Sequence, residues 1–148
     1  MTSASRLTVL LATTLTLAMA TTAALAHTDA PHPETLKASH GGQLGVAGSF
    51  SYELVIVKDA KVGKESPVVV YITDHAGQKI STTGASGTVT MLAGKLKANA
   101  LLQPDGDNRM KGIANYAATS DMKVVVSITL SGKQAEQTRF APMAVAKD

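Results

Sequence analysis

The sequence predicts an all-β fold, an antiparallel β-sandwich of immunoglobulin-like type with seven or eight strands. Three observations support this class. Apolar and polar residues alternate along several segments, turn-forming residues interrupt the chain about every 8 to 12 residues, and no segment has a helical period. Because the chain has no cysteine and only 3% aromatic residues, the predicted core consists of aliphatic side chains and methionine.

The first 26 residues are typical of a secretory signal peptide. Arg6 gives a positive start, residues 7–20 form an apolar run that is short for a membrane span, and residues 24–26 (ALA) form a small-x-small cleavage pattern. Residues 18–20 (AMA) form a second such pattern, but cleavage after residue 26 leaves a polar spacer. Export of a chain without disulfides favours a bacterial periplasm. We expect a periplasmic protein with no integral membrane segment after cleavage.

The mature chain is predicted to have a leader and one domain. Residues 27–39 (HTDAPHPETLKAS) contain two prolines and little apolar material, which predicts a flexible leader. Residues 40–148 are predicted to form the β-sandwich domain, long enough to fold without disulfides. Its alternation begins in residues 50–57 (FSYELVIV), where Tyr52 and Leu54 share the face predicted to be buried. Glu53 alternates to the opposite face and is predicted to face solvent.

Six further segments are predicted to be strands, each bounded by turn residues. They are residues 67–73 (PVVVYIT), 87–92 (GTVTML), 95–102 (KLKANALL), 109–116 (RMKGIANY), 122–130 (MKVVVSITL) and 134–143 (QAEQTRFAPM). Their β-branched positions predict a core that includes Val68, Val70, Ile72, Val89, Val124, Val126 and Ile128. The methionines are spread over different segments, so we expect them to fill gaps in this core. They are Met91, Met110, Met122 and Met143.

The composition argues against two classes of function. Basic residues are scattered and aromatic residues are rare, so we do not expect nucleic-acid binding. The chain has no nucleophile elbow, no Gly-rich phosphate loop and no spacing that identifies a nucleophile–base pair. We therefore do not expect an enzyme.

The histidines give the clearest indication of a function. His27 and His32 lie in the leader, His40 follows it, and His75 lies in the turn TDHAG. Neutral imidazole binds copper, zinc and nickel, and an N-terminal His27 would add its α-amine to its ring nitrogen as a copper chelate. Histidines in a flexible leader are more often simply solvated, and His75 is also explained as a turn residue beside Asp74.

His40 is the favoured single ligand. Gly41 and Gly42 permit a bend of the chain, but a turn does not require a histidine before them. We predict a site of His27 and His40, completed by His32 or His75. Glu53 joins this set if the chain after His40 folds back against residues 50–57, because a Glu–His pair suits a borderline divalent ion. Copper is the expected ion and zinc the alternative.

Several segments of the chain resemble a known pattern. They are residues 40–44 (HGGQL), 52–55 (YELV), 70–77 (VYITDHAG) and 84–91 (GASGTVTM). In this order they resemble small periplasmic proteins associated with heavy-metal resistance, and the β-rich N-terminal extension of some periplasmic adaptors of metal-efflux pumps. The resemblance covers roughly residues 40–95. It implies handling of copper, zinc or cobalt in the periplasm, and it favours His40 and His75 as ligands.

The resemblance implies an accessory protein rather than a complete adaptor, because the chain lacks the adaptor's helical hairpin and lipoyl-like parts. Such a protein would bind metal or assist a metal-efflux complex. The alternative is a non-metal interaction module or an assembly partner of an envelope complex, since immunoglobulin-like sandwiches often act as docking domains.

Overall fold

The computed structural model describes residues 37–144, which form eight antiparallel strands. The predicted all-β class is confirmed, and all seven predicted strands are present. The strand β1 was not predicted. The strands are β1 (Gln43–Ala47), β2 (Phe50–Ile56), β3 (Glu65–Asp74), β4 (Ser86–Ala93), β5 (Leu96–Pro104), β6 (Arg109–Asn115), β7 (Lys123–Thr129) and β8 (Ala135–Phe140).

The predicted signal peptide and most of the predicted leader, with His27 and His32, lie outside the described residues. Within residues 37–144, no helix is long and apolar enough to cross a membrane.

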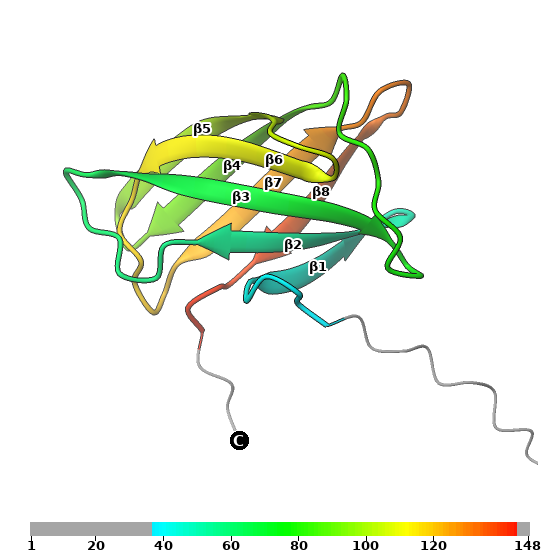
Figure 1. The fold of residues 1–148 in the computed structure, drawn as a ribbon. Coiled ribbons are helices and arrows are strands. Elements are labelled where there is room, and N and C mark those ends of the chain that lie inside the picture. Colours follow the sequence, from blue (N-terminus) through cyan, green and yellow to red (C-terminus); the bar gives the residue numbers. More distant parts are fainter. Residues whose placement is uncertain (1–36, 145–148) are drawn as a thin grey trace, which may run out of the picture. The chain divides into compact units, whose positions relative to one another are not determined.

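The strands form one nearly closed sheet in the order β1-β2-β3-β6-β5-β4-β7-β8. In Figure 1, β4, β7 and β8 cross obliquely behind β2 and β3, so that two faces enclose the core. Two faces around one core are the arrangement of a sandwich, but here hydrogen bonds also link the two halves. The link between β5 and β6 is short, because only Gln103 with Lys111 and Pro104 with Met110 are paired.

The two end strands, β1 and β8, lie against each other. The side-chain oxygen of Gln43 accepts a hydrogen bond of 2.9 Å from the backbone N–H of Ala141. A Cβ added to Gly45 would lie 2.8 Å from the Phe140 ring, so the absence of a side chain on β1 permits the close approach. The hydroxyl of Tyr52 donates a hydrogen bond of 2.8 Å to the Glu136 carboxylate and joins β2 to β8.

The core is mainly aliphatic. The prediction of a core of aliphatic side chains and methionine is incomplete, because four aromatic side chains are also buried in it: Phe50, Tyr52, Tyr116 and Phe140. Every one of the seven predicted core residues is 1% exposed or less, which confirms the alternation from which they were chosen. Met91, Met110 and Met122 are buried among them, and Met143 is partly buried against the same core. The methionines therefore fill the core rather than form a thioether site.

Candidate functional site

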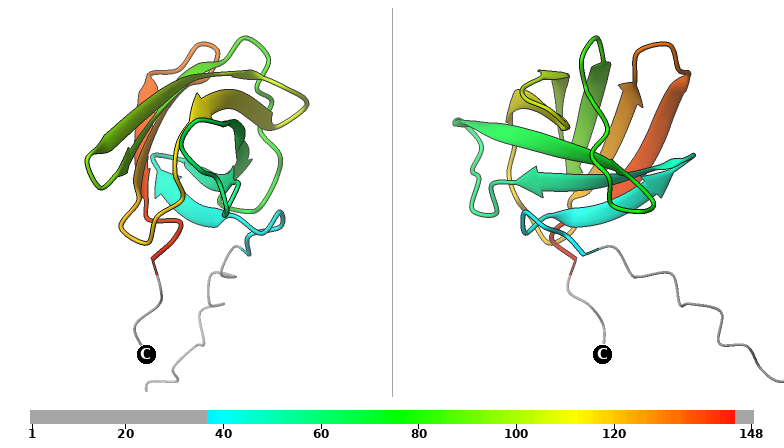
Figure 2. Two further views of the ribbon diagram at one scale, coloured as in Figure 1. Left: turned by 90° about the vertical axis from the view of Figure 1, so that its left-hand side faces the viewer. Right: turned by 45° about the vertical axis from the view of Figure 1, so that its right-hand side comes forward.

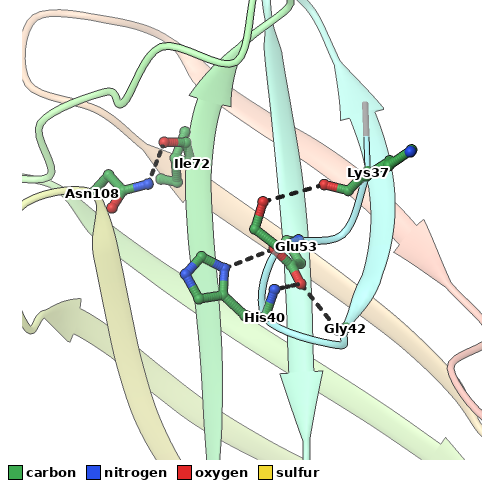
Figure 3. Close-up of polar contacts among 7 residues, drawn as sticks. Lys37, His40, Gly42, Glu53, Ile72 and Asn108 are labelled. Atoms are coloured by element: carbon green, nitrogen blue, oxygen red, sulfur yellow. Dashed lines mark hydrogen bonds and ion pairs between the residues drawn. The ribbon is translucent and has the colours of Figure 1, made fainter. Parts of the chain in front are cut away.

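The most unusual polar group in the described chain is the carboxylate of Glu53, on the outward face of β2. The prediction that Glu53 faces solvent is wrong, since the residue is only 5% exposed. Residues 39–42 fold back across the outside of the sheet and cover it (Figure 3). Alternation identified the correct face of the strand, but this face is covered by the chain's own N-terminal turn.

Glu53 accepts four hydrogen bonds from this turn. Its Oε1 accepts from the backbone N–H of His40 at 2.7 Å and of Gly42 at 3.0 Å. Its Oε2 accepts from the backbone N–H of Ser39 at 3.1 Å and lies 2.8 Å from the His40 Nδ1. Both oxygens are thus occupied, which offsets the loss of water around a buried carboxylate.

The two glycines explain why the sequence can fold this way. Gly41 has a φ of 74°, a left-handed conformation that side chains disfavour. Gly42 lies so close to β2 that an added Cβ would be 2.9 Å from the Glu53 Cγ and would also collide with the Leu54 backbone. Gly41 supplies the turn and Gly42 the close approach, so both are needed to bring His40 to Glu53.

The ring of His40 is held in one orientation by two contacts. Its Nδ1 faces the Glu53 carboxylate, and its plane stacks on Tyr71 of β3, with ring centroids 3.5 Å apart and an interplanar angle of 1°. Because an ionised carboxylate only accepts hydrogen bonds, the network places the ring proton on Nδ1. In the neutral form of the ring, Nε2 then carries the lone pair, and the side chain is 41% exposed.

Tyr71 lies on the central strand of three paired strands. The register places it between Glu53 on β2 and Arg109 on β6. The Arg109 guanidinium lies 2.9 Å from the Asp105 carboxylate, and its Nε donates a hydrogen bond of 2.8 Å to the Asp105 carbonyl. Asn108, next to Arg109, donates a side-chain hydrogen bond of 3.1 Å to the Ile72 carbonyl and ties this loop to β3. The ring beneath His40 therefore lies on a strand that is paired on both sides.

The hydrogen bonds also set the charge of Glu53. Burial alone raises the pKa of this carboxyl group, but the hydrogen bonds from Gly42 and His40, with the charge of a protonated His40, together outweigh burial. The net effect is a pKa below the ordinary value of 4.5. Glu53 is therefore ionised at neutral pH and holds the proton of His40 on Nδ1.

The structure brings together two of the five predicted site residues, His40 and Glu53. His75 lies in the turn after β3, where the Asp74 Oδ1 accepts from the N–H groups of Ala76 and Gln78 at 2.8 Å. This turn starts three residues along β3 from Tyr71, about 10 Å at the usual rise of a strand. In residues 37–144, no group of three or more His, Cys, Asp or Glu side chains is placed to hold a metal ion.

Sequence reasoning did not find Ser39 or Tyr71. Ser39 takes part only through its backbone, which carries no side-chain signal. Tyr71 had one: it is the aromatic residue on the outward side of a strand whose Val70 and Ile72 neighbours are buried. An aromatic ring at such a position needs a partner, and here the partner is His40.

No protein-family model matches the chain, and no curated protein matches its sequence. Function is therefore inferred from the geometry of this site and from the sequence.

Proposed function

We propose that this protein is a periplasmic metal-binding accessory protein in which His40 binds a copper ion through Nε2. The observation that carries the proposal is the hydrogen bond between His40 Nδ1 and the Glu53 carboxylate. Metal-binding histidines commonly donate their other ring N–H to a carboxylate, which fixes the tautomer and makes the ligating nitrogen more basic. In this proposal Glu53 orients His40 and is not itself a ligand, since both of its oxygens already accept hydrogen bonds.

The remaining ligands would come from the predicted leader. His32 precedes His40 by eight residues and His27 by thirteen. Eight residues span up to about 27 Å, more than enough to return to the His40 ring. A set of two or three imidazole nitrogens, with the α-amine if the chain begins at His27, favours copper, with zinc as the alternative. The ordering of Ser39 and His40 by Glu53 supports this proposal, because one ligand is then positioned before metal arrives.

A copper titration of the exported protein without a tag tests the proposal. Isothermal titration should give one Cu²⁺ site, and electron paramagnetic resonance should show nitrogen coupling. His40→Ala should weaken binding more than His32→Ala. Glu53→Gln should weaken binding about 10- to 100-fold, although it removes no ligand.

His75→Ala is the matched control, because in this proposal its imidazole, in the turn that starts about 10 Å along β3 from Tyr71, is not a ligand. Its copper affinity should equal that of the parent protein. Unchanged affinity in His40→Ala would refute His40 as a ligand. No binding at micromolar copper in the parent would refute the metal function and leave the interaction module as the better reading of the chain.

A further inference from the structure

The sheet is incompletely paired between β5 and β6, and we call this junction the seam. β5 pairs with β4 from Leu96 to Leu102, and β6 pairs with β3 from Arg109 to Asn115. Between them, β5 and β6 pair only at Gln103 and Pro104. In Figure 2 the β4–β5 hairpin extends beyond the part of β5 that pairs with β6, whereas β7 stays beside β4 almost to the tip of the hairpin. β6 also lies against β5 at Leu101, where a Cβ added to Gly112 would be 2.5 Å from the Leu101 carbonyl oxygen. Within the described chain, the edge of β5 without a strand partner therefore runs from Leu96 to Ala100, in contrast to the end strands β1 and β8, which cover each other.

Exposed apolar side chains gather along this seam. Four of the six exposed large hydrophobic residues line the two hollows beside it: Val62, Leu96, Leu101 and Ile113. Leu101 is 70% exposed and Ile113 55%. Leu101 and Ile113 flank the seam on the outer surface, and the gathering of such residues at an unpaired edge is typical of an interaction site.

The open end of the seam leads into an apolar pocket of about 230 Å³. Its walls include Leu96 and Ala98 from the inward face of β5, Met91 and Ala93 from β4, and Tyr116 after β6. The pocket exists because β6 does not follow β5 to its start, so the inner face of the hairpin tip is not covered. Its size suits one large apolar side chain, the kind of buried anchor that dominates binding energy at protein interfaces.

The charges at the rim select the kind of partner. Lys97 lines the pocket and Lys111 lines the groove beside Leu101. Neither is in an ion pair with a described residue, whereas Asp105 in the same groove is already paired with Arg109. Lysines on an edge strand disfavour pairing between identical edges, and two copies of a chain with formal net charge +3 also repel. The same lysines attract an acidic segment.

We propose that the seam between β5 and β6 binds an extended acidic segment of a partner protein, which adds as a strand to the free edge of β5 and places an apolar side chain in the pocket beside Leu96. Backbone hydrogen bonds to the edge provide affinity, and the pocket and lysines provide selectivity. None of the residues in the proposed contact belongs to the proposed copper site, so the proposal does not depend on metal binding.

Two synthetic peptides test it: a ten-residue peptide that alternates Val and Glu, and a matched one that alternates Val and Lys. The Glu peptide should bind the full protein with a Kd of about 100 μM or tighter. On binding, amide hydrogen exchange should slow at Lys97–Ala100 of β5, as expected for an added strand. The Lys peptide should not bind. Binding of both peptides equally, no binding of the Glu peptide at millimolar concentration, or protection at another edge would overturn the proposal.

Surface variants locate the contact without touching the core. The double variant Leu101→Lys with Ile113→Lys should weaken the Glu peptide at least about tenfold. Val46→Lys, a substitution at a 60% exposed residue of β1, is the control and should leave affinity unchanged. Charge reversal by Lys97→Glu with Lys111→Glu should transfer binding from the Glu peptide to the Lys peptide. A dimer in sedimentation that the Leu101→Lys, Ile113→Lys variant dissociates would assign the seam to a second copy and refute the acidic partner.

Discussion

Replacement of Glu53 by Gln tests the central feature of the site. Gln keeps one carbonyl oxygen, which can still accept from the N–H groups of His40 and Gly42 at the place of Oε1. Its amide group replaces Oε2, the atom that now lies 3.1 Å from the Ser39 nitrogen and 2.8 Å from the His40 Nδ1. Donor would then face donor at both contacts. His40 can relieve one conflict if its proton moves to Nε2, whereas the Ser39 N–H must turn to water.

The expected loss of stability follows from these contacts. Hydrogen bonds to a charged group contribute about 1.5–3 kcal/mol each, and neutral ones about 1 kcal/mol. Ser39 is exposed, so water can replace its contact with Glu53. We therefore expect the free energy of unfolding to fall by about 2 kcal/mol, because the carboxylate loses its charge and the contact between its Oε2 and the His40 Nδ1 is broken. For a domain of this size the melting temperature should fall by about 8 °C.

Thermal unfolding followed by circular dichroism measures this loss, and hydrogen exchange at the His40 and Gly42 amides shows whether the turn has opened. Glu65→Gln is the matched control, because it removes a carboxylate from an exposed position at the start of β3. The control should unfold within about 2 °C of the parent, as surface substitutions usually do. If Glu53→Gln were as stable as Glu65→Gln, the four hydrogen bonds would not hold the turn.

Three further outcomes are expected. Because the folded pKa of Glu53 lies below its ordinary value of 4.5, its contribution to stability is present above that value and is lost as pH falls through the folded pKa. The urea midpoint of the parent should therefore drop more steeply below pH 4.5 than that of Glu53→Gln. Parallel slopes would contradict this. Val126→Ala should cost about 1–3 kcal/mol in urea unfolding, since Val126 is 1% exposed and truncation leaves a cavity; no measurable loss would argue against its burial. Tyr71→Leu should cost about 0.5–1.5 kcal/mol through the lost stack on His40, and an unchanged His40 ring environment in the NMR spectrum would argue against the stack.

The sequence was sufficient to predict the strands because their inward positions are β-branched or aliphatic at a period of two. Residues 122–130 and 67–73 show this most clearly, and their inward residues are buried as expected. β1 was missed because its residues QLGVA do not alternate, and Gly45 is present for close approach to β8 rather than for burial. That role depends on a partner more than ninety residues away in the chain, so no local pattern reveals it.

The site was predicted only in part for a similar reason. His40 stood out because a turn does not require it, and Glu53 was proposed as a partner if the chain folded back. The four hydrogen bonds could not be predicted, because three donors are backbone N–H groups of Ser39, His40 and Gly42, which every sequence offers. Alternation describes a strand against one core, but here the outer face of β2 packs against the turn that precedes β1.

Anchoring of His40 also bears on which leader histidine would complete a copper site. Closing a loop from His32 to His40 involves eight residues and from His27 thirteen, and the difference in closure entropy is only about 0.4 kcal/mol. Chain length therefore hardly distinguishes the two. The α-amine distinguishes them, because it would give His27 a second ligating nitrogen without closing a further loop. His27 carries the α-amine only if the chain is cleaved after Ala26. Cleavage after Ala20 would leave six residues before His27, so His27 would no longer carry the α-amine. The proposed function therefore links two measurements, the intact mass of the exported protein and the copper affinity of His27→Ala. The substitution His27→Ala should weaken copper binding more than His32→Ala only if the mass shows that the chain begins at His27.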